Sequence, residues 1–297
     1  MTAGLPLVSI GIPTYNRVDL LKRSIDSALN QDYENIEIII SDNASTDGTA
    51  EICHNYTKKN AQISFIPNLI NQGPSANFSK VLNNAKGQYF MWLGDDDWID
   101  PTYVSRCVDM LDGNKSLSLV SGMSCYYRDS KKIYDGKVFN VVSDCPWCRV
   151  LSYYWKVADN AMFYGLMRTH QIKQLKMKNT MGGDWLLIAE IAFFGKVLTL
   201  KGFAVHRELG GATVSYKKIA STLGLSSFHG FFPFISIACA TLSEVINSPT
   251  YKLRPFFERI VVGLAIFVII ITKSLVIYTK ELVRHLKHLW LGSKKFL

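Results

Sequence analysis

The chain has 297 residues, of which 48% are hydrophobic and 19% charged, which excludes an intrinsically disordered protein and allows a sizeable core. The net charge of +9 is uneven, because residues 250–297 hold nine Lys or Arg and two acids, which leaves +2 on the first 249. Since this basic segment is also apolar, it indicates an anionic membrane surface as a partner, and not nucleic acid. The N-terminus shows no signal-peptide pattern, which predicts a location on the cytoplasmic side.

Apolar, β-branched runs alternate with helical patterns through the first hundred residues. We expect strands at residues 7–12, 36–40, 63–66 and 89–93, and helices at residues 18–31, 49–59 and 74–85. Further strands are expected near residues 117–125 and 197–200, and a helix from Asp184. Strands alternating with helices imply right-handed crossovers. The sequence therefore predicts an α/β fold, with a mostly parallel sheet between flanking helices.

Polar clusters directly follow three of the expected strands, at residues 13–17, 42–48 and 95–97. The carboxyl ends of parallel strands meet at one edge of a sheet, where ligands of such folds bind. We therefore expect the three clusters to converge on one ligand site.

The third cluster is the acidic run Asp95, Asp96 and Asp97. Three adjacent carboxylates repel one another unless a cation or solvent neutralises them. Oxygen ligands suit Mg²⁺ or Mn²⁺, and such an ion can neutralise charge on a leaving diphosphate. The alternative is a solvated turn that caps a helix beginning near Pro101.

Asp42 and Tyr15 are candidates for binding a nucleotide base. The carboxylate of Asp42 can accept the N3–H of uracil or thymine, or the N1–H of guanine, whereas N3 of cytosine carries no proton. Tyr15 can stack on the base. The alternative for Asp42 is an Asx turn with residues 43–45.

Together, the segments VSIGIPTYNR (residues 8–17), ISDNASTDGT (40–49) and WLGDDDW (92–98) closely resemble family 2 glycosyltransferases of the GT-A fold, of the bacterial cell-surface polysaccharide type. The resemblance is strong over residues 7–113, weaker to about 216 and absent from the tail. It implies inverting transfer of a sugar from a nucleotide sugar, with a UDP- or dTDP-sugar favoured, to a hydroxyl of a glycan or lipid-linked acceptor. The implied donor-binding residues are Pro13, Tyr15, Asp42, Asp95 and Asp96.

The motif gives two candidates for the metal ligand, because the family often has Asp-x-Asp-Asp where this chain begins with Gly94. Depending on the alignment, Asp97 or Asp96 is the ligand of Mg²⁺ or Mn²⁺, and both residues are candidates. In some relatives a His or Arg near position 206 approaches the metal or diphosphate, which makes His206 a third candidate. Asp47 is interpreted as part of the loop and as a helix cap.

The catalytic base is expected in the second half of the domain. The segment GGDWLLIAE (residues 182–190) resembles the family's Glu-Asp helix start, with Asp184 at the Asp position and Gly183 replacing Glu. An inverting transfer needs such a carboxylate to take the acceptor hydroxyl's proton. Asp184 could instead be only the helix N-cap. Asp159 and Asp144 are the other candidates for the base, and Glu190 is expected to be solvated.

A change of composition near residue 218 predicts two regions. Residues 1–218 form the catalytic domain, with a nucleotide half to about 113 and an acceptor half at 114–218, and residues 219–297 form a hydrophobic, basic helical region that associates with a membrane. Residues 260–279 carry one charge, Lys273, and are long enough to span a bilayer.

Basic residues flank the apolar run on both sides, and residues 280–297 read as a basic amphipathic helix. In-plane or hairpin attachment at the cytoplasmic face is therefore favoured over a span, and a soluble oligomerisation helix is the third possibility. Two rival functions stay open: a non-catalytic module that binds nucleotide sugars on a membrane assembly, and a nucleotidyltransferase.

Overall fold

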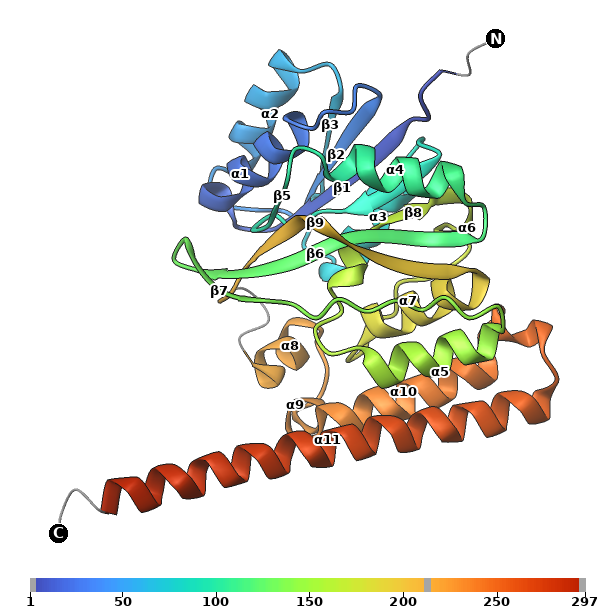
Figure 1. The fold of residues 1–297 in the computed structure, drawn as a ribbon. Coiled ribbons are helices and arrows are strands. Elements are labelled where there is room, and N and C mark those ends of the chain that lie inside the picture. The colour runs from blue at the N-terminus through green and yellow to red at the C-terminus, as the bar shows by residue number, and fades with distance from the viewer. Residues whose placement is uncertain (1–3, 211–214, 294–297) are drawn as a thin grey trace.

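The computed structural model describes residues 4–210 and 215–293. Within these residues nine strands form one sheet, in the order β3-β2-β1-β4-β8-β6-β9-β5, with β7 paired to β6 (Figure 1). The strands of the first half are β1 (Val8–Thr14), β2 (Ile36–Asp42), β3 (Ile63–Pro67) and β4 (Tyr89–Trp92). They pair in parallel, as predicted, and are connected by α1 (Val18–Leu29), α2 (Thr49–Lys59) and α3 (Pro74–Asn84).

The second half of the sheet is mixed. Its strands are β5 (Trp98–Ile99), β6 (Leu117–Arg128), β7 (Lys131–Asp135), β8 (Leu166–Arg168) and β9 (Lys196–Glu208). Strand β8 is antiparallel to β4 and β6, whereas β6 and β9 run parallel. The predicted α/β fold with flanking helices is confirmed, and its parallel part is the half that carries the three polar clusters.

Apolar side chains cover both faces of the sheet, so β1 is buried along its whole length. One core lies between the sheet and helices α1 and α4 (Tyr103–Gly113). The other core lies on the opposite face, where α7 (Gly183–Phe194), α5 (Pro146–Lys156), α10 (Pro233–Asn247) and α11 (Phe256–Ser293) follow one another away from the sheet in Figure 1. Short helices complete the chain: η1 (Ala161–Tyr164), α6 (Thr169–Ile172), α8 (Tyr216–Thr222), α9 (Ser227–Phe231) and η2 (Tyr251–Leu253).

Helix α7 is buried on nearly all sides, which makes the expectation of a solvated Glu190 wrong. Glu190 is only 3% exposed, and its carboxylate accepts a hydrogen bond from the hydroxyl of Ser248. Ser248 is the C-cap residue of α10, so this contact ties the buried helix to the tail. The buried carboxylate is tolerated because it has a hydrogen-bond donor.

The tail shares its core with the catalytic domain. Ile266 and Ile270 of α11 are fully buried in the same cluster as residues of α5 and α7. The ammonium group of Lys273 donates to the backbone carbonyls of Tyr154 and Val157, at 2.9 and 2.5 Å, and so caps the C-terminus of α5. The division near residue 218 stays a prediction, and the residues on its two sides are packed together.

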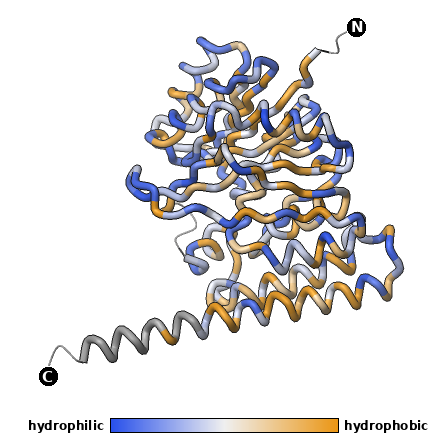
Figure 2. Tube along the Cα trace, in the orientation of Figure 1, coloured by the Kyte–Doolittle hydropathy of each residue, from blue (hydrophilic) through white to orange (hydrophobic). Residues whose placement is uncertain are grey.

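Helices α10 and α11 form the hairpin part of the tail, and Figure 2 shows hydrophobic residues along α10 and along the part of α11 beside it. Within the described residues, the segment Phe256–Thr279 of α11 is long and apolar enough to cross a membrane. Helix α11 continues through the region predicted as a separate amphipathic helix. Apart from Val283, the side chains of residues 280–293 lie outside the description, as do residues 294–297.

Candidate functional site

The loops after β1 and β2 are joined into one rigid edge. Asn16 adopts a left-handed φ of 51°, its backbone N–H donates to the hydroxyl of Ser45 at 2.8 Å, and its side-chain oxygen accepts from Thr46 at 2.8 Å. Asp47 accepts hydrogen bonds from the backbone N–H groups of Val18 and Thr49, at 3.0 and 3.1 Å. These bonds hold the first turns of α1 and α2, so the interpretation of Asp47 as a loop and cap residue is confirmed.

Asp42 lies at the end of β2 and is 3% exposed. Its carboxylate accepts hydrogen bonds from the backbone N–H of Ser45, at 3.2 Å, and from the Ser45 hydroxyl, which is the Asx turn allowed by the sequence. The neighbouring Pro13 is buried in β1, in register with Ser41 of β2, and Tyr15 projects from the same edge with its side chain exposed. The structure therefore brings together Pro13, Tyr15 and Asp42, whose binding of a nucleotide stays a prediction.

The three acids after β4 point to different partners. An oxygen of Asp95 accepts from the backbone N–H of Tyr15 at 3.4 Å, which connects the acidic run to the β1 loop. A carboxylate oxygen of Asp96 lies 3.9 Å from the guanidinium of Arg17. Burial, and then the charge of Asp96, raise the pKa of Asp95 to about 7.

Asp97 is the most buried of the three acids, at 2% exposure. One of its oxygens accepts from the backbone N–H of Glu208 at 3.1 Å, and the other lies 3.5 Å from Nε of Arg207 without forming a hydrogen bond. Burial raises the pKa of Asp97, in spite of the opposite charge of Arg207. Asp97 is thus a buried carboxylate with an unsatisfied oxygen and one cationic neighbour.

A divalent ion fits this arrangement only as a partner shared with a diphosphate. Among the described residues there is no group of three or more His, Cys, Asp or Glu that could hold a metal by itself. Mg²⁺ in nucleotide sites usually takes one or two carboxylates together with phosphate oxygens and water. The unsatisfied oxygen of Asp97 and the partly exposed carboxylate of Asp96 match that requirement.

His206 has partners of its own. Its Nε2 lies 2.7 Å from a carboxylate oxygen of Asp100, its Nδ1 lies 3.2 Å from the hydroxyl of Tyr127, and its ring stacks on Trp98. Successive side chains of a strand point to opposite faces, so the next residue of β9, Arg207, is the one that faces Asp97. The segment around residue 206 does reach the acidic run, as expected. The side chain that does so is Arg207, which was not among the predicted site residues.

A cavity of about 790 Å³ lies on the other side of Arg207. We call it the chamber. Its lining includes the start of α7, residues of η1, the ends of β6 and β9, and one face each of α8 and α10. Among the lining residues are Tyr126, Asn160, Phe163, Gly183, Asp184, Trp185, Arg207, Ile219, Phe234 and Ile237. Because Arg207 both lines the chamber and contacts Asp97, it joins the chamber to the acidic run.

Asp184 is one of the residues that line the chamber. Its carboxylate accepts a hydrogen bond from the side-chain amide of Asn160 at 2.8 Å, and Asn160 is fixed by the hydroxyl of Tyr153 at 2.7 Å. Burial raises the pKa of Asp184, although the hydrogen bond from Asn160 opposes the shift. The N-cap of α7 is Gly182, so Asp184 lies in the first turn and is not the cap.

The replacement of Glu by Gly183 has a steric reason. A Cβ atom at position 183 would lie 2.3 Å from the backbone oxygen of Lys178, which is closer than any real contact. At Gly94 a Cβ would lie 2.7 Å from a carboxylate oxygen of Asp97, which is the end of a side chain and can move more easily than backbone. The departure at Gly183 therefore fits the local packing of this chain more strictly than the one at Gly94.

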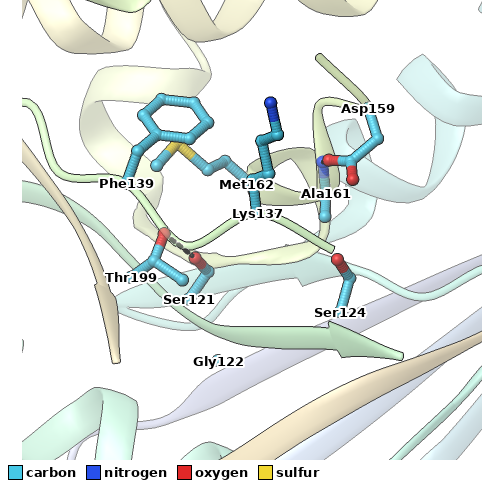
Figure 3. Close-up of a pocket in the computed structure, with 9 residues that line it drawn as sticks. All are labelled: Ser121, Gly122, Ser124, Lys137, Phe139, Asp159, Ala161, Met162 and Thr199. Carbon is cyan, nitrogen blue, oxygen red and sulfur yellow. Dashed lines mark hydrogen bonds between the residues drawn. The ribbon is translucent and has the colours of Figure 1, made fainter. Parts of the chain in front are cut away.

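The other candidate bases differ in position. Asp159 also lines the chamber, whereas Asp144 is 94% exposed in its side chain and pairs with Lys196 at 2.8 Å. Figure 3 shows a smaller cavity that also reaches Asp159, with the Ser121 and Thr199 hydroxyls hydrogen-bonded at 3.1 Å. Its volume is about 10 Å³, which is room for one water molecule and not for a sugar.

Comparison with known proteins gives several curated relatives. Glycosyltransferase GlyA of Streptococcus pneumoniae is 29% identical over 176 residues, which cover 59% of this chain and 24% of that protein. A Campylobacter jejuni protein, the GalNAc(5)-diNAcBac-PP-undecaprenol beta-1,3-glucosyltransferase, is 38% identical over 94 residues, or 31% of this chain and 30% of that protein. The chain thus spans less than a third of the length of either relative.

Solved structures show the same fold at low identity. Residues 1–349 of TarS from S. aureus, in complex with UDP-GlcNAc, align with a TM-score of 0.59 and 17% identity, over 85% of this chain and 69% of that one. The mannosyltransferase PcManGT from Pyrobaculum calidifontis, in complex with GDP-Man and Mn²⁺, aligns with a TM-score of 0.56 and 15% identity, over 91% and 87%.

The family model described as Glycosyl transferase family 2 matches residues 9–175, which is more than half of the chain. The matched region contains the three strand-end clusters, and the fold agrees with that of the solved structures. The chain belongs to glycosyl transferase family 2 and has the GT-A fold.

Proposed function

We propose that the protein is an inverting glycosyltransferase that moves a sugar from a UDP- or dTDP-sugar to a hydroxyl of a glycan or lipid-linked acceptor. The observation that carries the proposal is the position of Arg207 between two carboxylates with different surroundings. On one side it contacts Asp97 of the acidic run, and on the other it lines the chamber with Asp184. The arrangement supports a donor bound at the strand ends and an acceptor bound in the chamber.

The donor would be held by the residues at the edge of the sheet. Asp42 accepts a hydrogen bond from the base, Tyr15 stacks on it, and Pro13 shapes the backbone beside them. Asp95 and Asp96 lie next to this loop, through the contacts with Tyr15 and Arg17. The complex of TarS with UDP-GlcNAc supports a nucleotide sugar as the donor.

Asp97 and Asp96 would hold Mg²⁺ or Mn²⁺, which neutralises negative charge on the leaving nucleoside diphosphate. The guanidinium of Arg207 adds a fixed positive charge beside Asp97, stabilised by the hydroxyl of Tyr126 at 3.2 Å and by the ring of Tyr164. A cation held in a buried site costs little reorganisation when charge develops in the transition state. Arg207 would therefore stabilise the leaving group from the acceptor side.

Asp184 would be the catalytic base. A base works best when its pKa lies near the working pH, and burial moves the pKa of Asp184 upward in that direction. Asn160 holds the carboxylate in place through one of its oxygens, at a position where Asp184 lines the chamber. Direct attack of that hydroxyl on the anomeric carbon displaces the nucleoside diphosphate and inverts the configuration. Release of nucleoside diphosphate from a UDP- or dTDP-sugar tests the proposal.

We also propose that the protein attaches to the cytoplasmic face of a membrane through the outer face of α11. Phe257, Val261, Leu264, Val268 and Leu275 are each 50–75% exposed. At 100° per residue they fall on one narrow stripe, opposite the buried Ile266 and Ile270. We call these five residues the outer stripe.

The packing of the inner face of α11 favours attachment in the membrane plane over a span. A spanning helix would have to leave the core and break the bonds of Lys273 to α5, whereas an in-plane helix keeps them. The outer stripe is flanked at the start of the helix by the exposed Lys252 and the half-buried Arg254, which suits anionic lipid. The name of the Campylobacter relative, which includes an undecaprenol-linked acceptor, supports a membrane location.

Substitution of three residues of the outer stripe, Val261→Ser, Leu264→Ser and Val268→Ser, should lower binding to anionic vesicles at least about ten-fold, because each loses apolar area buried in lipid. Co-sedimentation of the purified protein with vesicles measures this. Leu69→Ser with Ile70→Ser is the matched control, since both residues are exposed and lie at the donor side.

Unchanged vesicle binding by the triple variant would refute attachment through α11. Deleting residues after Ser248 is a poorer test, because it also removes Ile266 and Ile270 from the shared core.

A further inference from the structure

We infer that the chamber binds the apolar chain of an amphiphilic acceptor, with the acceptor's hydroxyl-bearing head at Asp184. The inference rests on the proposed transferase function and names the class of acceptor that the site fits. It concerns the walls of the chamber, which are formed jointly by α7, α8 and α10.

The walls of the chamber are largely apolar and aromatic. Phe163, Trp185, Ile219, Phe234 and Ile237 contribute to them. Where these side chains form the wall, a ligand gains free energy by burying apolar surface, whereas a hydroxyl group placed there would lack a hydrogen-bond partner. The volume of about 790 Å³ is in the range of pockets that enclose a whole organic ligand. The walls therefore select a ligand with an apolar part.

The polar groups that the proposed chemistry needs are part of the chamber lining. Asp184 with its partner Asn160, and Arg207 with its link to Asp97, lie among the lining residues. A ligand whose polar head is bound there places a hydroxyl beside the base and toward the donor. Its apolar chain then extends along α8 and α10.

The chamber is preformed by contacts between the catalytic domain and the tail. The side-chain amide of Asn179 donates to the backbone oxygen of Leu223, at the end of α8, at 2.9 Å. Lys178 pairs with Glu244 of α10 at 3.2 Å. At Gly182 a Cβ atom would lie 2.9 Å from Ile237, so α7 and α10 are in close contact. These contacts join the segment before α7 and its N-cap to α8 and α10, the helices that form the walls.

The chain continues from α8, which lines the chamber, into a segment with exposed aromatic side chains. Helix α9 follows α8 directly and exposes Phe228 and Phe231, and Phe232 is exposed between α9 and α10. In Figure 1, α8 lies between the sheet and α9, with α11 as the outermost layer. An acceptor anchored in the bilayer would enter the chamber past these exposed aromatic residues.

The test is calorimetric titration of the full chain with methyl, hexyl and octyl glucosides, below their micelle concentrations. If the apolar chain enters the chamber, affinity should rise about four-fold for each added methylene. Thr222→Trp, on the face of α8 that lines the chamber, should abolish the dependence on chain length and leave UDP affinity unchanged. Ser221→Trp is the matched control, because Ser221 is exposed on the same helix and is not among the lining residues.

A second variant distinguishes binding of the apolar chain in the chamber from binding on the outer stripe. The triple substitution of the outer stripe should keep the dependence on chain length, because it leaves the chamber intact. Affinity that does not change with chain length would overturn the inference. So would an equal loss of the chain-length dependence in Thr222→Trp and Ser221→Trp. Titration reports binding without turnover, so a failure of the transferase proposal would appear as absent transfer with chain-dependent binding retained.

Discussion

Asp184→Asn is expected to lower turnover by roughly 10²–10⁴, the range for loss of a general base, and to leave donor affinity within a few-fold. The reason is its location in the chamber, apart from the loops proposed to bind the nucleotide. The substitution keeps the size of the side chain, and the amide oxygen can still accept the hydrogen bond from Asn160. Steady-state kinetics together with donor titration separates the two effects.

The two other candidate bases, Asp144 and Asp159, serve as controls for Asp184. Asp144→Asn changes an exposed carboxylate outside the chamber and should leave turnover unchanged. Asp159→Asn changes a second chamber acid and should have a much smaller effect than Asp184→Asn. Near wild-type turnover in Asp184→Asn, with a large loss in Asp159→Asn, would move the role of base to Asp159.

The pH dependence of the reaction rate follows from the direction in which the pKa of Asp184 is shifted. The base must be deprotonated to act, and burial raises its pKa above the ordinary value of 3.8. The rate should therefore fall as the pH drops through this raised pKa, at a higher pH than for an exposed carboxyl group. The acidic limb of the rate profile should disappear in Asp184→Asn.

Removal of divalent metal is expected to weaken donor binding strongly, and Asp96→Asn should remove most of this dependence. A metal that bridges carboxylate and diphosphate contributes to affinity only when both ligands are present. Calorimetric titration of a UDP-sugar with Mn²⁺ and with EDTA measures the difference. Asp109→Asn, an exposed acid of α4, should keep the full metal dependence.

Asp97→Asn should reduce the metal dependence as well, without lowering the stability of the metal-free protein at neutral pH. Burial raises the pKa of Asp97 in spite of Arg207, so the fold disfavours the ionised carboxylate and a neutral amide removes that cost. Thermal unfolding of the variant checks its stability separately from donor titration. Equal donor affinity of the wild-type protein in Mn²⁺ and in EDTA would refute the metal site.

The first half of the fold could be predicted closely because its signals are local. Each strand from β1 to β4 is a short apolar run, and each polar cluster begins where the run ends. The parallel pairing of β1 with β2 and β4 then brings Tyr15, Asp42 and Asp95 to one edge. These positions follow from strand order, which alternation with helices largely determines.

The rest of the site depends on contacts between distant residues. Strand β9 runs for 13 residues, well beyond the predicted stretch at 197–200. The choice between His206 and Arg207 depends on which face of the strand points to Asp97. Glu190 is buried by a partner 58 residues later in the chain. The chamber has walls from α7, α8 and α10, and no local pattern indicates that these helices meet.

The most direct test of the central claim is nucleoside diphosphate release by the purified full chain, in detergent with Mn²⁺, across a panel of sugar nucleotides with amphiphilic acceptors. We predict release from a UDP- or dTDP-sugar that needs both metal and acceptor, and that is lost in Asp184→Asn. Donor binding without release for every acceptor would indicate a non-catalytic binding module. Release of pyrophosphate from a nucleoside triphosphate would indicate a nucleotidyltransferase, and either result would contradict the account.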